Sequence, residues 1–314
     1  MEQKKSINIG FRGWMLVLWL ATAFLAYTVI GNYPLNILAD LYGGAQKLSA
    51  IYTAASVVGI LIQLGISGSI GKVKSIRMVS LVLGVLTVLS LVGIMYIPMS
   101  SPALWQVMYG VGTVISVMYG TFAISILVGQ WFPTRKGTIM GIATLAFPVG
   151  NGLLGPFAAS VFSKGFPDVA GAFLPFLLVI SAGWALGFIF IKDYPEQCGA
   201  YRDNNQSLTP EIAKKMMLEE IENQKTTVWK TGHTLKCLDF WLITIPMGTL
   251  LMFSVGMMTQ TAAIIGSFGD ALNYGQIMGM IMIFGCIGSY VLGLLDTKLG
   301  TKTAMTIAVL IIFV

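Results

Sequence analysis

This sequence is poor in charged residues. Asp, Glu, Lys and Arg together make up only 10% of its 314 residues, whereas about a quarter of a typical soluble domain is charged. Hydrophobic residues account for 56%, and the mean hydropathy is +0.81. The composition argues against an ordinary soluble domain and predicts an integral membrane protein. The net charge of +6 then reflects which loops are basic, and no nucleic-acid partner is expected.

Residues that bind metals or carry out catalysis are also scarce. The single histidine, His233, lies in a polar stretch, and the three cysteines show neither metal-ligand spacing nor the pattern of a disulfide framework. A membrane enzyme would need a clustered nucleophile, acid or metal, and the apolar segments offer none. We therefore expect no metal, no cofactor and no enzymatic activity. The cysteines are Cys198, Cys237 and Cys286.

The sequence contains instead a series of uncharged apolar runs. The first run could be a signal peptide, because Ala21-Thr22-Ala23 is a small-x-small triplet, but it continues to about 20 residues, the length of a spanning helix. The runs of this length predict an all-α membrane protein, a bundle of spanning helices. They are 14–33, 49–70, 78–98, 102–132, 137–162, 172–191, 240–265 and 274–295.

A further apolar run, 303–314, has only 12 residues. At a rise of about 1.5 Å per residue it extends roughly 18 Å, which is short of a hydrocarbon core about 30 Å thick. We therefore expect the sequence to be a truncated product or a fragment that ends inside its ninth span.

The composition changes after the sixth run, where the chain becomes polar and charged. This change predicts an N-terminal six-helix bundle at 1–191, a cytoplasmic linker at 192–239 and a partial C-terminal bundle at 240–314. In the linker, Thr209-Pro210-Glu211 is typical of a helix start, with a capping hydroxyl, a proline in the first turn and an early acid. An apolar stripe follows. We expect an amphipathic helix, either a solvated linker helix or a regulatory one.

Basic residues gather in one set of loops. If the runs cross a membrane in turn, 17 of the 19 Lys and Arg residues fall on the side of the amino terminus, and only Lys47 and Lys164 fall on the other. Positively charged loops tend to stay in the cytoplasm. We expect a multi-pass protein of a bacterial plasma membrane with a cytoplasmic amino terminus. Its expected partners are the lipid bilayer and a small-molecule substrate, and we expect a monomer.

The chain shows an internal repeat. The basic loop Gly68–Arg77 and the loop Asp296–Lys302 each follow the second apolar run of one half. Repeats of this kind are typical of transporters built from duplicated helical halves. At an offset of 226 residues, Gly43, Gly59 and Lys72 align with Gly269, Gly285 and Lys298.

Both loops resemble the signature of the major facilitator superfamily, G-x-x-x-D-R-x-G-R-K/R. In the first copy Lys72 stands where the acid belongs and Ser75 where the second glycine belongs, whereas the second copy keeps Asp296. In that superfamily the loop is thought to hold the inward face shut through charge contacts. We therefore expect Asp296→Asn to perturb closure more than Lys72→Ala. The residues that match this gating motif, or stand in its key positions, are Gly68, Lys72, Arg77, Asp296, Gly300 and Lys302.

Other segments strengthen the resemblance. Q-V-M-Y-G-V-G from Gln106 and N-G-L-L-G-P from Asn151 are similar to superfamily patterns in the fourth and fifth spans. The segments 129–142, with W-F-P before basic residues, and 238–244, L-D-F-W-L-I-T, resemble the oxalate/formate antiporter and monocarboxylate carrier branch. The resemblance implies alternating-access transport of a small solute, such as a monocarboxylate or dicarboxylate, by an antiporter. A non-transporting fragment or a membrane sensor of the same fold is the alternative.

Polar residues within the runs are the candidates for substrate binding. None of the eight runs contains Asp, Glu, His, Lys or Arg, which argues against a proton-coupled pump built from these helices. Uncharged polar side chains near mid-membrane remain, although each could instead make a helix–helix hydrogen bond. The candidate substrate-binding residues are Tyr27, Gln63, Tyr119, Asn151, Ser254, Gln260 and Tyr290.

The glycines and prolines of two runs predict their packing. Gly285, Ser289 and Gly293 form a small face on the eighth run, which allows a neighbouring helix to approach closely. Pro148 and Pro156 should bend the fifth run, because each removes a backbone donor.

Overall fold

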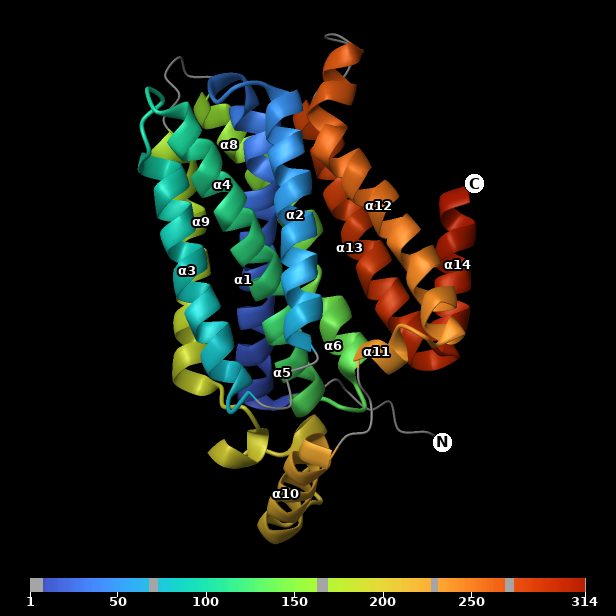
Figure 1. The fold of residues 1–314 in the computed structure, drawn as a ribbon. Helices are drawn as coiled ribbons and strands as arrows, with labels where there is room; N and C mark the ends of the chain where they lie inside the picture. The colour runs from blue at the N-terminus through green and yellow to red at the C-terminus, as the bar shows by residue number, and fades with distance from the viewer. Residues whose placement is uncertain (1–7, 68–72, 163–168, 227–230, 269–273, 314) are drawn as a thin grey trace.

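The computed structural model describes residues 8–67, 73–162, 169–226, 231–268 and 274–313 (Figure 1). Within these ranges every regular element is a helix, and no strand occurs. The all-α prediction is therefore confirmed. Two predicted gating residues, Gly68 and Lys72, lie outside the described residues.

Helices α1 to α9 pack into an upright bundle, which we call the N-terminal bundle (Figure 1). Helix α1 lies at its centre and contacts α4, α6, α7 and α9, while α3 packs between α4 and α9. The helices of the first four spans and the sixth are α1 (Gly10–Tyr33) with η1 (Pro34–Leu38) and η2 (Ala39–Leu41), α2 (Ala45–Ser67), α3 (Ile76–Tyr96), α4 (Pro102–Val117) with η4 (Met118–Ala123) and α5 (Ile124–Trp131), and α9 (Val169–Phe190).

The fifth span is interrupted rather than continuous, which corrects the single run expected at 137–162. It consists of α6 (Lys136–Ala143), α7 (Ala146–Val149), the π-helical η5 (Gly150–Leu154) and α8 (Gly155–Phe162). Pro148 lacks the N–H that an α-helix would direct at the Thr144 carbonyl, and this carbonyl accepts the Phe147 N–H instead, at 3.0 Å. The proline therefore disrupts the helix where a bend was predicted.

Six helical segments are long and apolar enough to cross a membrane by length and composition, within the described residues. The interrupted fifth span is not among them because its pieces are short. The six are Gly10–Leu41, Ala45–Ser67, Ile76–Tyr96, Pro102–Trp131, Val169–Phe190 and Gln276–Asp296.

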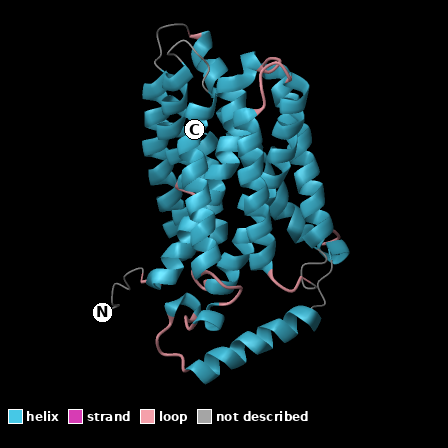
Figure 2. Cartoon of the chain, turned by 90° about the vertical axis from the view of Figure 1, so that its left-hand side faces the viewer, coloured by secondary structure: helices cyan, strands magenta, loops and turns pink. Residues whose placement is uncertain are grey.

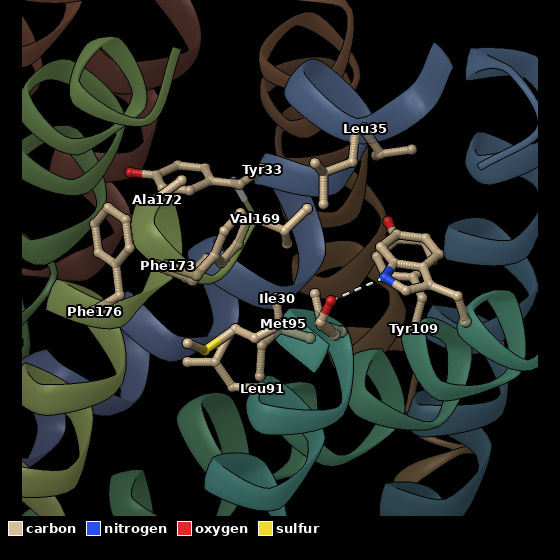
Figure 3. Packing of buried hydrophobic residues seen from close by; sticks show 14 of the residues in the cluster. Ile30, Tyr33, Leu35, Leu91, Met95, Tyr109, Val169, Ala172, Phe173 and Phe176 are labelled. Atoms are coloured by element: carbon tan, nitrogen blue, oxygen red, sulfur yellow. Dashed lines mark hydrogen bonds between the residues drawn. The ribbon is translucent and has the colours of Figure 1, made fainter. Parts of the chain in front are cut away.

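Aromatic side chains fill the end of the bundle opposite α10. Tyr33 of α1 lies beside Phe173 and Phe176 of α9, with ring centroids 6.4 and 5.4 Å away (Figure 3). Nearby, the Trp105 ring lies between Tyr42 and Tyr109, and its indole N–H donates to the Ile94 carbonyl at 3.0 Å. These contacts join α1, α3, α4 and α9 into one core.

Three helices, which we call the C-terminal helices, stand to one side of the bundle (Figure 1). They are α12 (Leu238–Ser267), α13 (Tyr274–Leu299) and α14 (Thr301–Phe313). Helix α13 contacts every piece of the fifth span, and α12 contacts η1. A Cβ placed on Gly141 of α6 would lie 3.3 Å from the Gly293 Cα of α13. The predicted small face on α13 therefore does allow close approach.

The polar segment between the two groups of helices is folded at the end of the bundle where α1 begins (Figure 1). Its first part, residues 192–204, holds η6 (Pro195–Cys198) and η7 (Arg202–Asn204), and we call it the linker clamp. The Trp131 indole donates to the Lys192 carbonyl at 3.0 Å, and the Asn204 amide donates to Asn8 Oδ1 at 3.1 Å. The linker clamp thus ties the end of α5 to the segment before α1.

The predicted linker helix is present as α10 (Pro210–Thr226), followed by the short α11 (Thr231–Thr234). Thr209 Oγ1 accepts the Ile212 N–H at 3.4 Å, which fits its expected capping role. Helix α10 lies beyond the ends of the bundle helices and across their direction (Figure 2). Ala213 is buried, but Ile212 and Met216 of the predicted stripe are exposed. The apolar stripe is therefore only partly covered.

Candidate functional site

Three spans of the N-terminal bundle contain a π-helical segment: η1 in the first, η4 in the fourth and η5 in the fifth. Helix α1 contacts both η4 and η5, and α2 contacts both η1 and η4. π-Helical turns are rare and often occur at functional sites. The part of the bundle around α1 and α2, which contact these segments, is therefore the first place to look for a binding site.

Three tyrosines from three spans gather around Gly31 of α1. The hydroxyls of Tyr27 and Tyr52 are 2.9 Å apart, so α1 and α2 share a hydrogen bond. The Tyr109 hydroxyl of α4 donates to the Gly31 carbonyl at 2.7 Å. A Cβ on Gly31 would lie 3.0 Å from Tyr52 Cε2, so glycine makes room for the Tyr52 ring. We call Tyr27, Tyr52 and Tyr109 the tyrosine cluster.

Sequence reasoning found Tyr27 but missed Tyr52 and Tyr109. The Tyr27 ring also meets Phe147 of α7 edge-on, with centroids 6.0 Å apart, so the tyrosine cluster reaches the interrupted fifth span. A signal was available, because each phenol within an apolar run must find a hydrogen-bond partner. The side of the helix on which each phenol lies could not be read from that signal.

Asn151 lies in η5, half-buried, where the fifth span meets α13. Its amide donates to the Phe147 carbonyl one turn earlier, at 3.0 Å. On the same segment, a Cβ on Gly152 would lie 2.8 Å from the Met278 carbonyl of α13. Asn151 therefore lies between the N-terminal bundle and the C-terminal helices, at the depth of the π-helical turn.

Gln63 and Tyr119 each make a hydrogen bond between two spans of the N-terminal bundle. The Gln63 amide of α2 donates to Thr121 Oγ1 of η4 at 3.3 Å. Tyr119 is fully buried, and its hydroxyl accepts the Trp19 indole N–H at 2.7 Å. Both side chains thus make the helix–helix hydrogen bonds that the sequence left open as the alternative.

The three candidates from the C-terminal helices are all exposed. Ser254 and Gln260 lie on α12, and Tyr290 lies on α13 with 46% of its surface accessible. The structure does not bring them into contact with the tyrosine cluster.

Gln106 of α4 stands where the superfamily pattern has arginine, and it binds the turn between the first two spans. Its amide donates to the Tyr42 carbonyl at 2.6 Å. The next residue, Gly43, has φ +111°, a backbone conformation that favours glycine. Burial raises the pKa of the Tyr42 phenol above its ordinary value of 10.0, so Tyr42 is neutral at physiological pH.

The second gating loop contacts the N-terminal bundle. A Cβ on Gly137, in the first turn of α6, would overlap Asp296 Oδ2 at the end of α13. The carboxylate therefore lies against the amino end of α6, where the helix dipole favours negative charge. Gly300 follows α13 with φ +80°, which ends the helix, and Lys302 is exposed in the first turn of α14.

The described end of the first gating loop is bound to α9 and to Asp193, which follows α9. Arg77 at its end donates from its guanidinium to the Phe188 carbonyl of α9 at 2.6 Å, and from its backbone N–H to Asp193 Oδ1 at 2.8 Å. The Ser75 hydroxyl donates to Asp193 Oδ2 at 2.7 Å. Sequence reasoning missed Asp193, which lies in the linker clamp and outside the motif.

No cluster of His, Cys, Asp or Glu suited to a metal ion is found in the ranges that the structure describes. The features of the site are instead neutral hydroxyls, an amide and close helix crossings. Such a site can bind a solute by hydrogen bonds and can move as its helices shift.

These features define an all-α membrane protein of the transporter type, with a helical bundle, a folded linker and a second group of helices beginning after it. The family model of the Major Facilitator Superfamily matches residues 15–314, and the chain belongs to this superfamily. Its function is therefore the transmembrane transport of a small solute. A comparison with curated proteins finds no match.

Proposed function

We propose that the transported solute is a small organic anion, a monocarboxylate or dicarboxylate, which moves by alternating access. The resemblance of segments 129–142 and 238–244 to carboxylate carriers supports this substrate class. The observation that carries the binding site is the hydroxyl pair of Tyr27 and Tyr52.

The chemistry of this pair suits an anion. One hydroxyl donates to the other, and the second therefore keeps an O–H that can donate to a ligand. A hydrogen bond to a carboxylate oxygen is charge-assisted and stronger than one between neutral groups. The edge of the Phe147 ring beside Tyr27 adds an apolar wall. In the proposed site, Asn151 and Gln63 supply further polar contacts from the N-terminal bundle, while Tyr119 supports the bundle core. Ser254, Gln260 and Tyr290 would reach the solute only when the C-terminal helices move toward the tyrosine cluster during alternating access.

Asp296 completes the proposal as a gating residue. Its contact with the first turn of α6 joins the C-terminal helices to the N-terminal bundle at the α10 end. We propose that this contact forms when that end closes and breaks when it opens. Arg77, Gly300 and Lys302 then shape the two loops, and the first loop includes Gly68 and Lys72.

Uptake by the purified chain in proteoliposomes tests this proposal. We expect saturable uptake of labelled carboxylates and none of neutral solutes of equal size. Tyr27→Phe and Tyr52→Phe should each raise KM about fivefold to tenfold, as the loss of one hydrogen bond implies. Tyr96→Phe is the matched control, because Tyr96 is 63% exposed at the end of α3.

Two results would contradict the proposal. Uptake of neutral solutes in preference to carboxylates would exclude the substrate class, and unchanged KM in both tyrosine variants would exclude the hydroxyl pair. Carboxylate binding without any uptake would favour the alternative, a sensor of the same fold.

A further inference from the structure

The first turn of α3 is capped by a carboxylate from the linker clamp. Ser75 is the N-cap residue, and its hydroxyl accepts the Met78 N–H at 3.1 Å. The same hydroxyl donates to Asp193 Oδ2, while Asp193 Oδ1 accepts the Arg77 N–H. Asp193 follows α9, so the acid reaches α3 from the segment directly after the sixth span. The negative charge lies at the amino end of a helix, where it is stabilised.

A second contact runs in the opposite direction. The Arg77 guanidinium donates to the Phe188 carbonyl near the end of α9 and lies over the Phe188 ring, 5.7 Å from its centroid. Asp193 and Arg77 therefore hold the start of α3 and the end of α9 together by bonds in both directions. Both groups are charged, and hydrogen bonds to charged groups are the stronger class.

The two gating loops are thus bound differently. In the first loop Lys72 replaces the motif acid, and the carboxylate at its end comes from Asp193, in the linker clamp directly after α9 of the same bundle. In the second loop the motif acid Asp296 is present and contacts α6, which belongs to the other group of helices. One carboxylate joins helices of one bundle, and the other joins the two groups.

We propose that Asp193 is a positioning residue that fixes the end of the first gating loop, at Ser75 and Arg77, to the N-terminal bundle. Opening and closing at the α10 end then depend on Asp296 and do not require Ser75 or Arg77 to release Asp193. The inference concerns regulation of the proposed gate, so it rests on the gating part of the proposed function.

The test compares Asp193→Asn with Asp296→Asn on two readouts in the full chain, with native cysteines replaced. The local readout is the thiol-labelling rate of Ile76→Cys, a buried position between Ser75 and Arg77. The readout between groups is the distance between spin labels at Thr134 and Thr301, both exposed. Asp40→Asn, an exposed acid in η2 away from both loops, is the matched control.

Asp193→Asn should raise the labelling rate at position 76 about tenfold, the factor expected for losing a charge-assisted bond, and should leave the distance between the spin labels unchanged. Asp296→Asn should change the distance between the spin labels and leave the labelling rate unchanged. The effects of Ser75→Ala and Asp193→Asn on the labelling rate should not add in the double variant, because both substitutions weaken the same hydrogen bond. Asp193→Glu should recover part of the slow labelling.

An Asp193→Asn variant that shifts the label distance as much as Asp296→Asn would overturn the inference, and so would additive effects of Ser75→Ala and Asp193→Asn. These readouts require no substrate. Failure of carboxylate uptake with the labelling pattern intact would therefore remove the proposed substrate and leave the role of Asp193 standing.

Discussion

Glycine sets the distance between the fifth span and α13 where Gly141 crosses Gly293. A Cβ on Gly141 would meet the Gly293 Cα at 3.3 Å and the Ser289 carbonyl oxygen at 3.4 Å. Both are backbone atoms, so neither can rotate away as a side chain would. Any larger residue at position 141 must push the two helices apart.

We therefore predict that Gly141→Leu destabilises the contact between the two groups of helices. Overpacking of this kind costs about 1–3 kcal/mol, so the midpoint of thermal unfolding should fall by several degrees. Gly288→Leu on α13 is the control, because a Cβ there meets nothing within 4 Å. Equal midpoints for the two variants would show that the crossing does not contribute to stability.

Individual site residues could be predicted only in part from the sequence. Tyr27, Asn151 and Tyr119 were all proposed because each is a polar group in an apolar run, yet Tyr119 lies fully buried in the core. In a soluble helix the polar face shows which side is exposed. In a membrane helix the lipid-facing and the buried sides are both apolar, so the sequence does not show where each phenol points.

Helical elements were more predictable than their irregularities. The apolar runs predicted the spans, whereas Pro148 predicted only a bend in the fifth, where the structure has an interruption. The π-helical η4 contains no proline, and its signal lies in packing: a Cβ on Gly120 would be 3.1 Å from the Ala23 carbonyl. Such a contact depends on a distant segment of the chain, so it is invisible to local patterns.

Helix α10 is joined to the linker clamp by one arginine. Arg202 binds Glu196 of η6 at 2.9 Å and also Glu220 of α10, and its guanidinium lies over the Tyr194 ring. The Arg202 and Glu196 side chains are only 11% and 5% exposed. Removing one partner from a buried ion pair leaves an uncompensated charge.

We predict that Arg202→Gln frees α10 from the linker clamp. Limited proteolysis between residues 205 and 209 should become several-fold faster, because the helix no longer holds this segment. Lys215→Gln is the control, since its pair with Glu219 spans 3.8 Å and both side chains are more than half exposed. Equal cleavage rates in the two variants would show that Arg202 does not hold the helix.

At the scale of the whole molecule, the arrangement of loops permits a test of orientation. The described loops that follow the second, fourth and sixth spans lie at the end of the bundle near α10, together with the described start of the chain (Figure 1). The basic residues of the sequence concentrate in these same loops. Positively charged loops favour the cytoplasm, so this end should face inward.

We predict that an impermeant thiol reagent applied to intact cells labels single cysteines at Gln46 and Ser100. It should not reach cysteines at Lys74, Asn205 or Thr301 until the membrane is opened. All five positions are exposed, so a failure to react reports the membrane rather than burial. Labelling of the second group from outside would reverse the orientation.

The cap on α3 has a consequence for the order in which the protein is made. The backbone N–H of Arg77 binds a carboxylate that lies 116 residues further along the chain. Synthesis of α3 is therefore finished long before its capping acid leaves the ribosome. A chain that stops at residue 191 leaves this N–H without its acceptor and also lacks the clamp residues that bind α5 and Asn8. The unit that folds together thus extends past the last membrane-spanning residue of the sixth span, into the polar segment.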